Sequence, residues 1–87
     1  MTNREPRLDS EANERIRARY DAAKAAERRA ADARRRAGAA RDAADRAVTE
    51  YVRRAHHRVA DLHTDLAVSH EDFARTLRLG GDEPAYD

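Results

Sequence analysis

Small and apolar side chains recur along most of the chain at alternating steps of three and four residues. A first phase consists entirely of alanine: Ala23, Ala26, Ala30, Ala33, Ala37, Ala40, Ala44 and Ala47. A second phase follows in the same steps: Val52, Ala55, Val59, Leu62, Leu66, Ser69 and Phe73. The two phases join near Tyr51 with an extra offset, like a stutter in a coiled coil. This spacing is typical of helices that bury a narrow stripe against another helix, and it predicts an all-α fold.

Local signals indicate where the helical region begins and ends. Asp9 or Ser10 can cap a helix N-terminus, and Gly80 followed by glycine is a C-terminal stop signal. We therefore expect a helical region over 9–79, a flexible N-terminal tail over 1–8 and an acidic C-terminal tail over 80–87.

Gly38 leaves two arrangements open. A glycine within a helix costs only about 1 kcal/mol relative to alanine, so the helix can continue through it. Alternatively, the chain turns at 37–41 and forms a long antiparallel helical hairpin from helices 9–36 and 42–79. Facing residues would then have numbers that sum to about 78, so that Ile16 meets Leu62 and Arg34 meets Asp42. An unbroken helix would instead pair antiparallel with a second copy and make nearly the same contacts.

Ser69 is a second candidate break, because Ser69 and Asp72 have the spacing of a capping box. The segment after it would then be a short separate helix that docks a partner. The alternative is that helix 42–79 simply continues through Ser69.

Large apolar side chains are few, and aromatic residues make up only 5% of the chain. So small a core favours self-association or a partner-bound state, such as a homodimer that forms a four-helix bundle. For self-packing we select Ile16, Tyr20, Val52, Val59, Leu62 and Leu66. For contact with a partner protein we select Phe73, Leu77 and Leu79.

Charge is unevenly distributed along the chain. Residues 28–58 carry ten arginines against four acidic residues, a net charge of +6, whereas residues 59–87 carry two arginines against seven acids. Arginine clusters can contact phosphate groups, or they can form the solvated surface of a coiled coil. The candidates for phosphate contact are Arg28, Arg29, Arg34, Arg35, Arg36, Arg53 and Arg54.

Three histidines, His56, His63 and His70, repeat every seven residues beside the second phase. Successive members lie about 10.5 Å apart along a helix, so no two of them can hold one metal ion. They are either structural residues at the edge of a helix interface or groups that make such an interface sensitive to pH.

The sequence offers no set of residues that indicates enzymatic chemistry. The chain has no cysteine, no glycine-rich phosphate loop and no plausible nucleophile–base set. We therefore expect neither enzymatic activity nor a cofactor, a metal or a small-molecule substrate. The N-terminus lacks the apolar core of a signal peptide and no apolar run could span a membrane, so we expect a cytoplasmic location without membrane contact.

The function that these features favour is a non-catalytic protein-interaction module, a small regulatory or assembly adaptor that presents helical surfaces. The alternative is a nucleic-acid-associated protein that binds phosphates through the arginine-rich segment 28–58.

Overall fold

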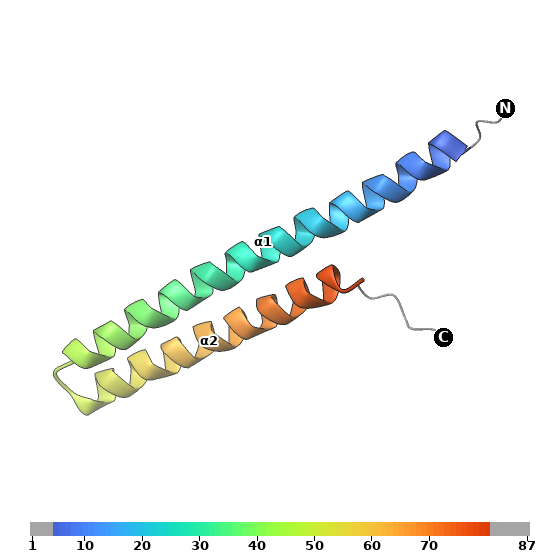
Figure 1. The fold of residues 1–87 in the computed structure, drawn as a ribbon. Helices are drawn as coiled ribbons and strands as arrows, with labels where there is room; N and C mark the ends of the chain where they lie inside the picture. The colour runs from blue at the N-terminus through green and yellow to red at the C-terminus, as the bar shows by residue number, and fades with distance from the viewer. Residues whose placement is uncertain (1–4, 81–87) are drawn as a thin grey trace, which may run out of the picture.

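Two long helices account for nearly all of the computed structural model, which describes residues 5–80, with side chains from residue 10 onward. Helix α1 runs over Glu5–Arg46 and helix α2 over Glu50–Arg78. They lie side by side and antiparallel, as Figure 1 shows, in a hairpin with extents of 76 × 25 × 11 Å. The predicted all-α antiparallel hairpin is confirmed.

The position of the turn differs from the prediction. Residues 37–41 are helical and belong to α1, whereas the chain reverses direction at residues 47–49. Gly38 is tolerated because the alanines on both sides favour helix, and because Ala37 and Ala40 are buried against α2. A turn at 37–41 would have interrupted this continuous row of alanines.

Residues 47–49 turn the chain because the local sequence stops favouring helix. Val48 and Thr49 are both β-branched, which lowers helix propensity. Thr49 has extended backbone angles, φ −112° and ψ 156°, and its hydroxyl accepts a hydrogen bond of 3.2 Å from the backbone N–H of Val52. Thr49 is thus the N-cap of α2, and the acidic Glu50 follows it in the first turn, where negative charge suits the helix dipole.

Both outer ends of the hairpin were partly predictable. Helix α2 continues through Ser69 without a break and stops where Gly80 adopts a left-handed φ of 115°. Helix α1 begins at Glu5, earlier than expected, because Pro6 is tolerated in the first turn, where no N–H is needed. Residues 5–8 are therefore helical rather than part of a tail, while 1–4 and 81–87 lie outside the described residues.

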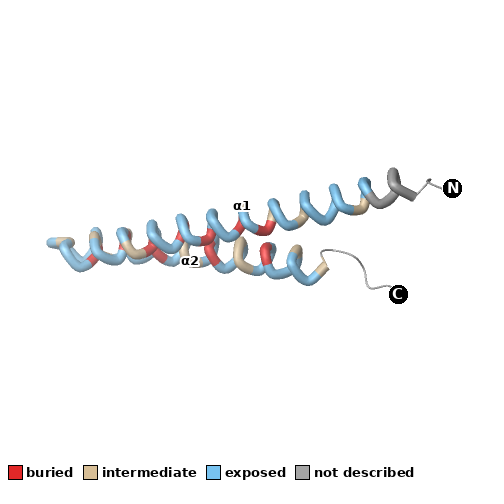
Figure 2. The backbone as a smooth tube through the Cα atoms, turned by 45° about the horizontal axis from the view of Figure 1, so that its top comes forward, coloured by how far each residue is buried: buried red, intermediate tan, exposed pale blue. Residues whose placement is uncertain are grey.

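The core between the helices is made of alanine. Within residues 10–80, every buried side chain is an alanine, and Figure 2 shows these positions along the inner side of the hairpin. The set comprises Ala23, Ala26, Ala30, Ala33, Ala37, Ala40 and Ala44 of α1, together with Ala60, Ala67 and Ala74 of α2. We call this set the alanine seam. Seven of the eight alanines of the first predicted phase therefore face the other helix, and the eighth, Ala47, lies in the turn.

Candidate interaction surface

The register of the hairpin determines which residues of α2 face α1. Ala74 packs against Ala23 and Ala26, and the numbers of the facing pair 23 and 74 sum to 97 rather than 78. Ile16 therefore lies near Leu77, with which it lines a shallow hollow, and not opposite Leu62. Arg34 pairs with Glu71 instead of Asp42.

Helix α2 contributes a different set of residues to the seam from the one that the sequence indicated. The half-buried His56, His63 and His70 alternate with the three buried alanines of α2, again in steps of three and four. The second predicted phase is displaced by one residue from this set. Since adjacent residues differ by about 100° around a helix, that phase points to the side of the hairpin instead of into it.

Five large apolar side chains of the second phase are consequently exposed. Their exposed fractions are 64% for Leu62, 53% for Phe73, 50% for Leu66, 42% for Val59 and 40% for Val52. We call these five residues the α2 stripe. The physical reason is the close approach of the helices: alanine on α1 must be matched by small side chains on α2, and the alanines of α2 supply them.

The other residues selected for packing lie at the open end of the hairpin. Ile16 and Tyr20 of α1 are about half exposed, at 55% and 51%. Leu77 is half-buried against Ala23, Ala26 and Ala74, so it belongs to the hairpin itself rather than to an exposed partner surface. Of the three residues selected for a partner, Phe73 and Leu79 are exposed.

Polar contacts hold the helices in register along one edge. Arg34 donates two hydrogen bonds of 2.7 and 2.8 Å to the carboxylate of Glu71, and Arg78 donates two of 2.6 and 2.9 Å to Glu27. The guanidinium of Arg78 also lies 4.8 Å from the ring centre of Tyr20. The hydrogen bonds from Arg34 and Arg78, as the main cause, lower the pKa of Glu71 and of Glu27.

The histidine row lies between the helices. The Nδ1 atom of His63 is buried and has no hydrogen-bond partner among the described residues. In residues 10–80, no group of three or more His, Cys, Asp or Glu side chains is arranged to hold a metal ion. The location of the histidines at the helix interface fits the structural interpretation, while the pH-sensitive interface stays a prediction.

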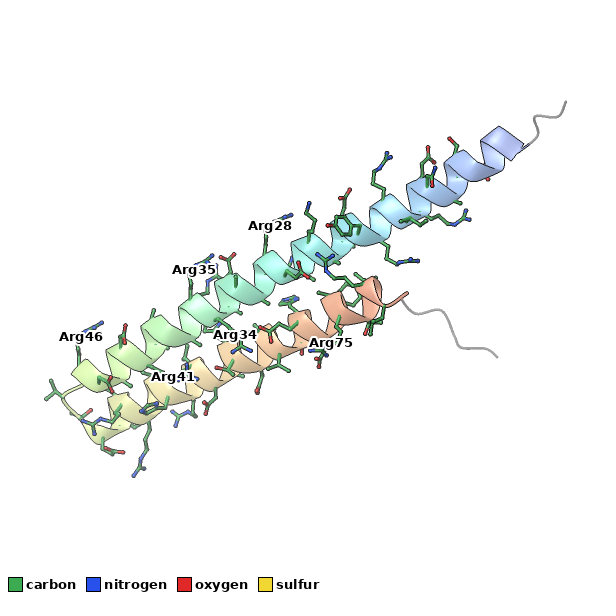
Figure 3. All side chains as sticks on the ribbon, in the orientation of Figure 1. Arg28, Arg34, Arg35, Arg41, Arg46 and Arg75 are labelled. Carbon is green, nitrogen blue, oxygen red and sulfur yellow. The ribbon has the colours of Figure 1, made fainter. Side chains whose placement is uncertain are left out.

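The arginines selected for phosphate contact are dispersed around the hairpin. Figure 3 shows that Arg28, Arg35 and Arg46 point away from α2, whereas Arg34 and Arg41 lie on the side toward it. Four of the seven selected side chains are engaged in ion pairs, namely Arg34 with Glu71, Arg35 with Asp32, and both Arg53 and Arg54 with Glu50. Positive charge is therefore interleaved with carboxylates and is not focused on one face.

Compared with known proteins, the chain matches no family model, no curated protein and no solved structure. Neither of the two described helices contains a segment long and apolar enough to cross a membrane.

Proposed function

We propose that this chain is a non-catalytic protein-interaction module, which binds a helix of another chain along the α2 stripe. The observation that supports the proposal is that two neighbouring sides of α2 carry side chains of different size. One side carries small residues that close the hairpin, and the neighbouring side carries large apolar residues that the hairpin leaves exposed.

Exposed apolar residues are normal when they are scattered, but here they follow a helical repeat. Val52, Val59, Leu66 and Phe73 are seven residues apart, and Leu62 lies between the second and third of them. Such spacing places the residues on one face of a helix. A helix that binds in a groove or against another helix makes its contacts through a row of this kind. Contiguous apolar surface of this type marks interaction sites in soluble proteins.

The surface also has a fixed shape. The alanine seam, the turn and the two bidentate ion pairs hold α2 against α1, and no stripe side chain belongs to the seam or to these ion pairs. A partner would therefore meet a surface that is already formed, which reduces the entropic cost of binding.

Photo-crosslinking in cells that produce the protein tests this proposal. A benzophenone amino acid is placed at Leu62 on the stripe or, as a control, at Val68, which is 43% exposed on another side of the same helix. We expect protein adducts from the probe at position 62 and few from position 68. Equal adduct yields from the two positions, or no adduct at position 62, would contradict the proposal.

A further inference from the structure

We infer that the α2 stripe binds a second copy of this chain, with the two α2 helices antiparallel. This inference rests on the proposed function and names the partner of the same surface. In the arrangement that we infer, α2 residues of the two copies face each other when their numbers sum to 128.

Side-chain sizes match well in this arrangement. Leu62 meets Leu66 of the second copy at the centre of the contact. On either side Val59 meets Ser69, and farther out Ala55 meets Phe73, so a large residue faces a small one. These pairs, with Val52 opposite Thr76 at the ends, use the whole stripe and the smaller residues between its members.

Other pairings of the same two helices fit less well. A shift of seven residues, to a sum of 121, leaves Phe73 without a partner on the opposite α2. A parallel pair places Phe73 against Phe73 and Ala55 against Ala55, which crowds one layer and leaves a gap in another. A well-packed core tolerates neither change without loss of stability.

Charges beside the stripe are also complementary in this arrangement. Arg58, Asp65 and Asp72 each precede a stripe residue, so they share one flank of α2. In an antiparallel pair this flank meets the same flank of the second copy, and Arg58 lies near Asp72 in both halves of the contact. Two attractive pairs therefore accompany one repulsive pair, between the two copies of Asp65 at the centre. Asp72 also accepts a hydrogen bond of 2.8 Å from Arg75 of its own helix, and a carboxylate can accept both.

The opposite flank explains why a parallel pair is disfavoured. It carries His56, His63 and His70, which are half-buried in the alanine seam. In a parallel pair, Arg58 and Asp72 would have to meet these histidines instead of each other. In the antiparallel pair like flanks meet, so the histidine flank lies beside the histidine flank of the second copy, and Arg58 and Asp72 meet each other instead of histidines.

The position of the stripe also suits an assembly of two hairpins. Stripe residues immediately precede seam residues, as Val59 precedes Ala60 and Leu66 precedes Ala67. The two contacts of α2 are therefore about 100° apart around its axis. A helix at the corner of a four-helix bundle has its two neighbours in this relation. The stretch from residue 52 to residue 76 is about 36 Å long.

Disulfide trapping tests the register directly, since the chain contains no cysteine. Val59→Cys and Ser69→Cys chains, carrying tags of different mass, are mixed and oxidised. We expect the mixed disulfide to dominate, because positions 59 and 69 face each other, whereas two copies of position 59 are offset by about 15 Å along the axis. Predominance of the Val59→Cys homodisulfide would indicate a parallel pair and overturn the inference. Val68→Cys mixed with Val59→Cys is the negative control.

Sedimentation velocity over a range of concentrations tests the association itself. Val59 and Val68 form a matched pair with exposed fractions of 42% and 43%, and nine residues place them on opposite sides of α2. We expect Val59→Asp to raise the dimer dissociation constant at least tenfold and Val68→Asp to leave it within twofold. Circular dichroism reports whether each variant is helical, and Val59→Ser replaces Val59→Asp if that variant unfolds.

The outcomes separate the two proposals. A wild-type chain that stays monomeric at all concentrations overturns self-association. If the benzophenone probe at Leu62 then forms adducts with a different protein, the interaction module itself still stands. If that probe forms no adduct and the chain is monomeric, both proposals are wrong.

Discussion

Replacement of Ala60 by leucine should destabilise the hairpin far more than the same replacement at an exposed alanine. Ala60 is 0% exposed, and in the observed register it faces Ala37, which is 2% exposed. Leucine adds three carbon atoms at a point where two backbones approach closely. Because the added atoms have no space, the helix axes must separate locally.

The magnitude follows from two contributions. Forcing extra methylene groups into a packed core typically costs about 1–3 kcal/mol. Separation of the helices also uncovers neighbouring alanine methyl groups, each of which contributes about 0.8 kcal/mol when it is buried. We therefore expect Ala60→Leu to lower the free energy of unfolding by about 2 kcal/mol or more.

Ala31→Leu is the matched control. Ala31 is exposed on α1, so the same change of residue alters only helix propensity and surface, with an expected effect within about 0.5 kcal/mol. Urea denaturation followed by circular dichroism, at one protein concentration for all variants, gives both values. Equal stability of the two variants would show that Ala60 does not face α1, and the register on which the α2 stripe depends would be wrong.

Three further predictions concern the turn, the glycine and the ion pairs. Gly38→Ala should stabilise the protein by about 1 kcal/mol in urea denaturation, because Gly38 is helical and a Cβ there meets nothing within 4 Å; destabilisation would instead support a turn at 37–41. Thr49→Ala should lower the free energy of unfolding by about 0.5–2 kcal/mol because it removes the N-cap of α2, whereas Thr49→Ser should retain most of the stability. Equal free energies of unfolding for the two variants would contradict the capping role. The lowered pKa values of Glu27 and Glu71 mean that their contribution is present above the ordinary value of 4.5 and is lost as the pH falls through the lowered values. The melting temperature of the wild type should therefore fall more between pH 6 and pH 3 than that of a Glu27→Gln, Glu71→Gln variant, and parallel curves would refute this assignment.

The fold class and the inner face of α1 could be predicted from the sequence because a repeat of alanines has only one plausible role. Alanines in three–four spacing share one face of a helix, and a closely packed neighbouring helix buries all of them in the same way. The end of α2 was also predictable, since glycine is the residue that most readily adopts the left-handed conformation there.

The position of the turn could not be read from residue types alone. Gly38 is the stronger helix breaker by propensity, but its cost of about 1 kcal/mol is small beside a continuous buried row of alanines. Val48 and Thr49 are weaker breakers, yet they lie where the two phases of the pattern fail to join. That offset near Tyr51 was the available signal, and it indicates a turn as well as a stutter.

The exposed stripe was misplaced for a related reason. Ranking by hydrophobicity assigns Leu62 and Leu66 to the interior, whereas the helix spacing set by alanine on α1 admits only small partners such as Ala60 and Ala67. Which face of α2 turns inward depends on the register, and the register depends on the turn. The later turn therefore places Leu62 and Leu66 on the side of the hairpin instead of between its helices, while Phe73 and Leu79 are exposed, as their selection for a partner requires.

A seam of identical small residues has translational symmetry, because a slip of seven residues would bring alanine against alanine again. Methyl groups alone therefore do not distinguish neighbouring registers. The charged residues distinguish these registers. A slip in one direction would bring Arg78 beside Arg34, and a slip in the other would bring Glu71 beside Glu27. The alternation of positive and negative charge along this edge thus fixes the register, because sliding in either direction brings like charges together.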